Sequence, residues 1–303
     1  MPFSSRTLTA ILLSYCSALV AQSSDAELAA FWNFESGRRG TELWTTHLHG
    51  KGTTPNCYDE LGGIKFIESK NAFFMKRFGL PSLSVVNAAD EGIPPFEGEH
   101  VLKATVFNDE TAYLDYAESI GLPRTSHASY TKARIDPAVP TGNFRLGDGE
   151  SAWFGFAFYL PTDYVFETAD WGTESICELQ YREDIPPGAS AKGGPFGLAV
   201  GAGKLHVGTR FSPTDNPKQS TERKDFAFEI SRGRWHTIVC HVRFDFTPNG
   251  YAEVWLDGRK IVDEHGLRIG YQAMQQAKAA LDVMTNYKHN WWAEPRQYGD
   301  FTK

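Results

Sequence analysis

The feature that most constrains this chain is a succession of short β-like runs separated by turns rich in Gly, Pro, Asn and Asp. The runs are Phe31–Glu35, His100–Phe107, Tyr130–Asp136, Ala152–Leu160, Ser175–Arg182, Gly197–Val200, Lys204–Phe211, Trp235–Phe244 and Tyr251–Leu256. Only Tyr113–Ile120 and Tyr271–Leu281 have the composition of helices, and both segments are short. The pattern predicts an all-β fold, an antiparallel β-jelly-roll sandwich with a few short helices.

The clearest hairpin joins Trp235–Phe244 to Tyr251–Leu256 through residues 247–250, and Asp257-Gly258 marks the next tight turn. The chain has 303 residues, of which 41% are hydrophobic and 14% aromatic, so it can bury a large core. All-β chains of this size often form one domain. We therefore expect residues 22–303 to form a single domain.

The first 21 residues have the features of a secretory signal peptide. Arg6 gives a positive start, Leu8–Val20 is mostly apolar, and Ala21 is a small residue at the expected cleavage point. The apolar run is shorter than the roughly 20 residues that span a bilayer, and no later segment is long enough. We therefore expect a secreted protein, extracellular or periplasmic, without a membrane partner.

Removal of this leader would take Cys16 with it and leave Cys57, Cys177 and Cys240. In an oxidising compartment, this odd number allows one disulfide and one free thiol. Cys177 and Cys240 lie in strand-like runs, which favours the alternative that both are small buried hydrophobic residues.

The charge balance restricts the partners of this protein. The chain has 30 Lys and Arg residues against 37 Asp and Glu residues, a formal net charge of -7. A general nucleic-acid binder needs a basic surface, so we expect no nucleic-acid partner. A polyanionic substrate would have to meet a locally basic cleft.

Three predicted strands alternate between polar and apolar residues, so each presents one polar face. The polar positions are Tyr130, Lys132 and Arg134 in the first strand, Glu178, Gln180 and Arg182 in the second, and Lys204, His206 and Arg210 in the third. These faces fit one concave sheet with a cationic lining. From alternation alone, an ordinary solvated sheet face is the favoured interpretation.

Four segments together resemble one enzyme family. They are Phe31–Gly37, Gly149–Pro161, Arg234–Ile238 and Gly250–Gly258. They are similar to the polysaccharide lyase family that contains heparin lyase I and the glucuronan lyases. This resemblance implies a jelly roll that cleaves a uronic-acid polysaccharide by β-elimination, often with bound calcium.

The resemblance also implies roles for particular residues. Arg134 resembles the arginine that engages the substrate carboxylate, and Gln180 resembles a glutamine in a strand lining the cleft. Arg182 stands where the family pattern has a histidine. Residues 286–290 resemble the segment with the catalytic tyrosine, which would be Tyr287, followed by the basic Lys288.

The remaining predicted site residues complete this assignment. His289 shares strand parity with Tyr287 and is the candidate partner base. The predicted substrate-binding residues are Lys132, Arg182, Lys288, His127, Tyr130, Arg210 and Trp291. Glu35 and Asp300, near the two ends of the domain, are candidate ligands for a structural Ca²⁺.

Elimination explains why cationic residues would gather around such a site. Removing the proton at C5 of a uronate adds negative charge next to its carboxylate, and Arg134, Lys132 and Gln180 can offset that charge. A glycoside hydrolase would instead need two closely placed acids, and the acid-rich strand of jelly-roll glucanases is missing. We therefore expect a monomeric lyase acting on an acidic polysaccharide. The alternative is a non-catalytic carbohydrate-binding module.

Overall fold

The structure is a computed structural model that describes part of the chain. The described residues are 9–14, 72–81, 83–96, 98–106, 109–121, 133–135, 146–164, 166, 174–186, 194–213 and 222–288.

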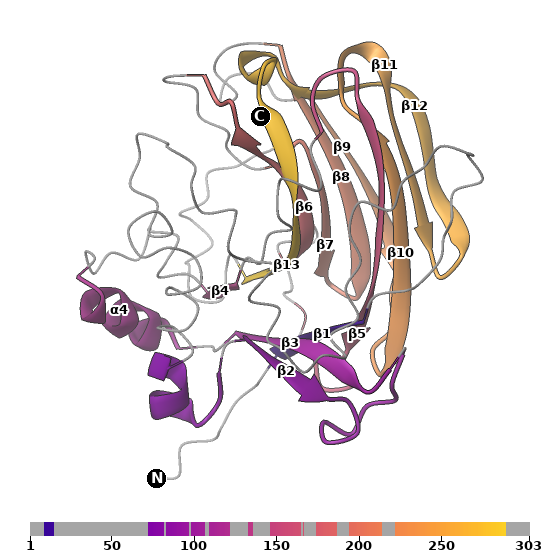
Figure 1. The fold of residues 1–303 in the computed structure, drawn as a ribbon. Helices are drawn as coiled ribbons and strands as arrows, with labels where there is room; N and C mark the ends of the chain where they lie inside the picture. Colours follow the sequence, from indigo (N-terminus) through magenta and orange to yellow (C-terminus); the bar gives the residue numbers. More distant parts are fainter. Residues whose placement is uncertain are drawn as a thin grey trace.

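Strands make up most of the described residues (Figure 1). The strands are β1 Thr9–Ser14, β2 Leu83–Asn87, β3 His100–Val106, β4 Ala133–Ile135, β5 Ser151–Leu160, β6 Glu174–Glu183, β7 Phe196–Gly201, β8 Lys204–Ser212, β9 Glu222–Glu229, β10 Arg234–Arg243, β11 Asp245–Leu256, β12 Arg259–Tyr271 and β13 Lys278–Lys288. The helical segments are residues 72–78, α4 Glu110–Ser119 and a single 3₁₀ turn, Gln272–Met274.

The strands form two sheets that share β12. Sheet A has the order β2-β3-β1-β5-β10-β11-β12, and sheet B continues as β12-β8-β7-β6-β13-β4, with β9 paired to β8. All pairs are antiparallel except the last two residues of β12, Gly270 and Tyr271, which pair in parallel with Phe211 and Ser212 of β8. The predicted antiparallel jelly-roll sandwich is therefore confirmed.

The core lies between the two sheets, where apolar side chains of both meet. Phe154 of sheet A contacts Phe196 of sheet B edge to face, with ring centroids 6.1 Å apart. Cys177 and Cys240 are both completely buried in this core, and no disulfide joins them. The interpretation of these two cysteines as small buried residues is confirmed, and burial raises the pKa of the Cys240 thiol well above its usual value.

One of the two predicted helices is confirmed and the other is wrong. The expected helix Tyr113–Ile120 lies largely within α4, which begins earlier because Asp109 accepts a hydrogen bond from the Ala112 amide at 3.0 Å. The expected helix Tyr271–Leu281 is instead the end of β12, a 3₁₀ turn and the start of β13. Its Ala- and Gln-rich composition favours a helix, but pairing of β13 with β6 over most of its length overrides that preference.

The predicted strands within the described residues are confirmed, with bounds that shift by a few residues. Phe31–Glu35 lies outside the described residues. The hairpin between β10 and β11 is present, but β11 begins at Asp245, so the expected turn residues 247–250 lie inside this irregular strand. The alternation did not predict β2, β9, β12 and β13.

Strand β1 lies inside the predicted leader. It pairs with β3 on one side and with β5 on the other. Cleavage after Ala21 would remove this strand from sheet A, and the secretion of the protein stays a prediction. Within the described residues, no helix combines the length and apolarity that crossing a membrane requires.

The side chain of Asp257 connects the turn between β11 and β12 to the start of β10 by hydrogen bonds. Asp257 and Gly258 have φ angles of 52° and 77°, the left-handed values of a type I′ hairpin turn. One carboxylate oxygen of Asp257 accepts bonds from Arg234 at 2.7 Å and lies 2.9 Å from Nδ1 of His236. The other accepts the Thr237 amide at 2.9 Å. His236 is only 3% exposed, so this carboxylate partners a buried ring.

We predict that Asp257→Ala lowers the free energy of unfolding by about 2–3 kcal/mol, because it leaves Nδ1 of the buried His236 ring without its acceptor and removes a residue suited to positive φ. Asp257→Asn keeps the turn preference and an acceptor oxygen, so its loss should be smaller. Urea denaturation measures both. Equal stability of Asp257→Ala and the parent would contradict the role of this carboxylate.

Candidate functional site

Sheet B has one polar face, on the side away from sheet A. Its side chains come from β6, β8 and β9, and we call this set the polar face: Glu178, Gln180, His206, Arg210, Arg223 and Asp225. The alternate residues of the same strands are buried toward sheet A, among them Cys177, Leu179, Tyr181, Leu205, Val207 and Phe211. The predicted alternation in β6 and β8 is therefore confirmed.

Two glycines interrupt the polar face at its centre. Cross-strand register places Glu178 opposite Gly197, Gly197 opposite Gly208, and Gly208 opposite Asp225. Partners of this kind share one face of a sheet, so bare backbone lies between the two carboxylates. A Cβ atom at Gly208 would lie 3.0 Å from an oxygen of Asp225, and a larger side chain would cover this strip.

The polar side chains bond to one another within each strand. The amide nitrogen of Gln180 donates to the carboxylate of Glu178, and the Arg223 Nε is 2.6 Å from Asp225 Oδ2. Burial lowers the pKa of Arg223, although Asp225 opposes the shift. Both carboxylates of the polar face therefore already have a donor.

Arg210 lies near a buried tyrosine. Its guanidinium lies close enough to the hydroxyl of Tyr271, which is only 1% exposed, to favour the ionised phenol. Burial nevertheless raises the pKa of Tyr271, so the phenol stays protonated at neutral pH. Because this neighbour is a neutral phenol, it does not cancel the charge of the guanidinium.

His206 is nearly buried, with 7% of its surface exposed. Burial lowers the pKa of its imidazole, although Asp225 and a bond to a backbone carbonyl oppose the shift. Nε2 lies 3.4 Å from the carbonyl oxygen of Gly201, which favours the tautomer with the proton on Nε2. The ring is therefore neutral at pH 7, with Nδ1 as an acceptor.

Backbone register brings two predicted catalytic residues together. Tyr287 of β13 lies directly opposite Arg134 of β4, and on the other side of β13 it is the register partner of Ser175 in β6. Ser175 is in turn opposite Ala199, and Ala199 is opposite His206. These cross-strand partners form one row across the sheet, which runs from Arg134 and Tyr287 through Ser175 and Ala199 to His206 on the polar face.

A β-bulge makes this row possible. Ser175 and Cys177 of β6 pair with consecutive residues of β7, Ala199 and Leu198, so Ile176 is the extra residue. A bulge shifts the alternation by one position. Ser175 therefore shares a face with Ala199 and not with the core residue Cys177.

Gln180 lies in a different part of the sheet from Tyr287. Along β6, Gln180 is five residues from Ser175, a distance of about 16 Å at the rise of a strand. The register partner of Gln180 on β13 is Ala280. The predicted site residues thus form two regions, one at Arg134 and Tyr287 and one at Gln180 and Arg210.

Several predicted site residues are not placed by this geometry. Arg182 lies in β6, within a predicted strand, and Lys288 is the last residue of β13. The others lie outside the described residues: His127, Tyr130, Lys132, His289, Trp291, Glu35 and Asp300. Their assigned roles stay predictions.

Sequence analysis missed three residues of this site or next to it, and it missed the protonation state of a fourth. Arg223 and Asp225 belong to β9, whose charged first half hides the strand pattern. Tyr271 lay in a segment expected to be helical. His206 was placed on the correct face by alternation, but only its burial reveals that it is neutral.

One group of acidic and histidine side chains in the described residues has the spacing of metal ligands. Glu253, Asp263 and His265 offer ligand atoms that all lie within 4.8 Å of one another. However, the ammonium of Lys260 bonds to Glu253 at 2.6 Å and to Asp263 at 3.1 Å. The Lys260 ammonium is therefore an internal cation that already pairs with both carboxylates, and the group lies on sheet A.

Comparison with known proteins gives one family match. A family model described as polysaccharide lyase matches residues 91–281. Among solved structures, an endo-β-1,4-glucuronan lyase from the fungus Trichoderma reesei is 19% identical, with a TM-score of 0.48 over 69% of this chain and 76% of that chain. The alginate lyase Aly36B is 10% identical, with a TM-score of 0.30 over 71% of this chain and 91% of that chain. No curated protein matches this chain.

We predict that His206 makes the protein less stable in mild acid. Its pKa is lower in the folded state, so the unfolded chain binds more protons, and stability is lost as pH falls below about 6.5 toward that lowered pKa. Urea denaturation between pH 8 and pH 5 should show a smaller loss for His206→Gln than for the parent. Asp225→Asn should lower the His206 pKa further in an NMR titration. Parallel stability curves for His206→Gln and the parent would contradict this assignment.

Proposed function

Because this chain belongs to the polysaccharide lyase family, we propose that it cleaves a uronic-acid polysaccharide by β-elimination at sheet B. In this proposal the polymer lies across the polar face and the row that leads from it to Tyr287. The glycine strip of Gly197 and Gly208 leaves room for sugar rings at the centre of the sheet.

The observation that supports this proposal most is the pairing of Arg134 with Tyr287. The two residues come from distant parts of the sequence, and the sheet places them directly opposite each other. Directly opposed residues have Cβ atoms about 4.5–5.5 Å apart. An arginine and a tyrosine at this spacing can act on one uronate ring.

In the proposed reaction, Arg134 binds the carboxylate and offsets the charge that develops when the C5 proton leaves. The electron pair of the broken C5–H bond forms the C4–C5 double bond, and the C4–O bond to the next sugar breaks. The departing oxygen takes up a proton. Tyr287 either accepts the C5 proton or donates the proton that the departing oxygen takes up. To accept the C5 proton it must first lose its own proton, and a neighbouring cation favours that by lowering the pKa of the tyrosine hydroxyl.

Gln180 is about 16 Å along β6 from Ser175, and Arg210 is about 13 Å along β8 from His206, so we assign both to binding sugar rings next to the one that reacts. Arg210 suits the carboxylate of such a ring because its partner Tyr271 leaves the positive charge available. Gln180 adds amide hydrogen bonds. This assignment changes the role of Gln180 from a catalytic residue to a substrate-binding one.

His206 gives a second arrangement of the same chemistry. Its neutral ring is an acceptor at pH 7, and it lies in the row that contains Tyr287, three strand spacings or about 14 Å away. In this arrangement His206 removes the C5 proton and Tyr287 protonates the leaving oxygen. The two side chains would then reach toward each other across the sugar.

Hydrolysis fits the polar face less well. Its two carboxylates, Glu178 and Asp225, are separated by Gly197 and Gly208 in the register, again about 14 Å between their backbones. Glycosidases place their two carboxyl groups roughly 5–9.5 Å apart. Each of these carboxylates is also bonded to a neighbour on its own strand.

We predict that Tyr287→Phe lowers turnover at least about a hundredfold, with a smaller change in KM, because it removes only the hydroxyl that moves a proton. Arg134→Lys should also lose much of the rate, since lysine keeps the charge but not the planar fork. The absorbance of the unsaturated product, followed on glucuronan, alginate and heparin, measures both. Arg259→Lys, an exposed arginine of β12, is the matched control.

Parental turnover in both Tyr287→Phe and Arg134→Lys would overturn these roles. If no uronic-acid polymer gives an unsaturated product with the parent protein, the proposed reaction is wrong. If Tyr287→Phe is inactive because it unfolds, the hydroxyl has a structural role, and the circular dichroism spectrum distinguishes this outcome from loss of proton transfer.

We further propose a structural calcium ion at Glu35 and Asp300, two oxygen donors near the ends of the sequence. Removing a ligand that binds only the folded state lowers stability. We predict that excess chelator lowers the melting temperature of the parent but not of a Glu35→Gln, Asp300→Asn double variant. An unchanged melting curve of the parent in chelator would contradict a tightly bound ion.

A further inference from the structure

A second group of ordered side chains lies on the outer face of sheet A, on the opposite side of the sandwich from the polar face. Strand register places Trp153 of β5 opposite His241 of β10, His241 opposite Glu253 of β11, and Glu253 opposite Asp263 of β12. Tyr251 and His265 form the neighbouring register pair. We call these residues, with Trp255 and Lys260, the Trp153 face.

Aromatic rings dominate one end of the Trp153 face. Trp153, the third residue of the ten-residue strand β5, is 47% exposed, which is unusual for a tryptophan. Its ring stacks on His241 with centroids 4.0 Å apart and on Trp255 with centroids 5.4 Å apart. The Lys260 ammonium lies 4.8 Å from the centre of the Trp255 ring.

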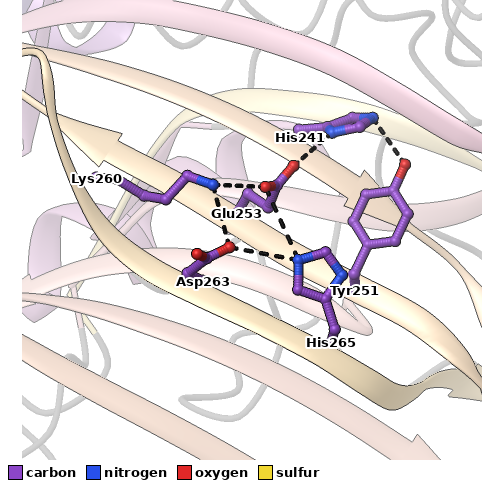
Figure 2. Close-up of polar contacts among 6 residues, drawn as sticks. All are labelled: His241, Tyr251, Glu253, Lys260, Asp263 and His265. Atoms are coloured by element: carbon purple, nitrogen blue, oxygen red, sulfur yellow. Dashed lines mark hydrogen bonds and ion pairs between the residues drawn. The ribbon is translucent and has the colours of Figure 1, made fainter.

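Hydrogen bonds fix the polar end of this face, as Figure 2 shows. His241 has a partner on each ring nitrogen, Glu253 at 2.8 Å and the hydroxyl of Tyr251 at 2.8 Å. Lys260 bridges Glu253 and Asp263, and His265 lies 3.3 Å from Asp263. The rings and polar groups are therefore held in place before any ligand arrives, which reduces the entropy lost on binding.

The composition of the Trp153 face disfavours a protein partner. The buried centre of a protein interface is depleted of charged residues, because covering them costs desolvation energy. Here Lys260 is the register partner of Trp255, and Glu253 lies two strands from Trp153 and two residues from Trp255. A ligand that offers both flat C–H faces and many hydroxyl groups would satisfy the rings and the charged groups together. A chain of pyranose sugars has this chemistry.

The charge of the Trp153 face favours an uncharged sugar chain. Burial raises the pKa of Glu253, but bonds from Lys260 and His241 outweigh it and lower the pKa below its usual value. The bond from Lys260 likewise lowers the pKa of Asp263. Arg243, in the row of Tyr251, is paired with Asp245 at 3.4 Å. The remaining charges at neutral pH are therefore two carboxylates and one ammonium, and a uronic-acid polymer would meet net negative charge.

We propose that the Trp153 face is a second carbohydrate-binding site that takes a neutral pyranose polysaccharide, such as a β-1,4-glucan, by stacking sugar rings on Trp153 and Trp255. Glu253, Lys260 and His265 bond to its hydroxyl groups. The site holds the protein on a neutral polymer while sheet B faces the other way.

Affinity electrophoresis tests this site with two neutral probes, hydroxyethyl cellulose and xyloglucan, and with glucuronan as the acidic probe. The neutral glucans should slow the migration of the parent. Trp153→Ala should raise the dissociation constant at least about fivefold, because it removes the central ring, and Trp153→Tyr should be intermediate. Met75→Ala, which changes another residue that is half exposed, should migrate as the parent does.

Thermal melting identifies any loss of fold in Trp153→Ala, and in that case Trp153→Tyr, which keeps a ring, decides the test. Equal migration of the parent and both Trp153 variants in the neutral glucans would overturn the proposal. So would retardation of the parent by glucuronan alone. The lyase assay is a separate readout: Trp153→Ala should cleave a uronic-acid polymer at the parental rate, and a parent that cleaves none still shows retardation if this site exists.

Discussion

Sheets A and B join at the end of β12, and this junction fixes where the polar face of sheet B lies. Gly270 and Tyr271 leave sheet A and pair in parallel with the end of β8, the only parallel pairing among the described strands. The backbone turns there with a φ of 128° at Gly270, and a Cβ atom at this position would lie 2.6 Å from Phe246 and 2.8 Å from the Tyr181 hydroxyl. Only glycine avoids both the strain and the clash.

This junction also links the core to the polar face. Tyr271 is buried in the core, its amide donates to the hydroxyl of Tyr181 at 3.4 Å, and its own hydroxyl lies near the guanidinium of Arg210. The residue that closes the sandwich is therefore also a neighbour of a cation on the polar face.

The two outer surfaces of the sandwich differ in what they can bind. The polar face of sheet B has exposed backbone at Gly197 and Gly208, with charged groups on both sides. The outer face of sheet A has bulky rings at Trp153 and Trp255, held by a hydrogen-bonded cluster. The polar face of sheet B suits an acidic polymer that is cleaved, and the outer face of sheet A suits a neutral polymer that is bound without being cleaved.

The sequence by itself determined the fold class, because alternating residues in runs bounded by turn formers specify antiparallel strands with one buried face. It also placed His206 and Arg210 on one face of β8, and Glu178 and Gln180 on one face of β6. These are local properties, since side chains of a strand alternate whatever the strand pairs with. The family resemblance then suggested Arg134 and Tyr287.

Only the tertiary structure decided which strands are neighbours. It made residues 278–288 a strand against their helical composition, and the bulge at Ile176 set the register that joins the row of Tyr287 to that of His206. It also separated Gln180 from Tyr287 and brought Trp153 against His241. The physical reason is that register depends on pairing partners far apart in the sequence and on irregularities such as bulges, neither of which a local pattern contains.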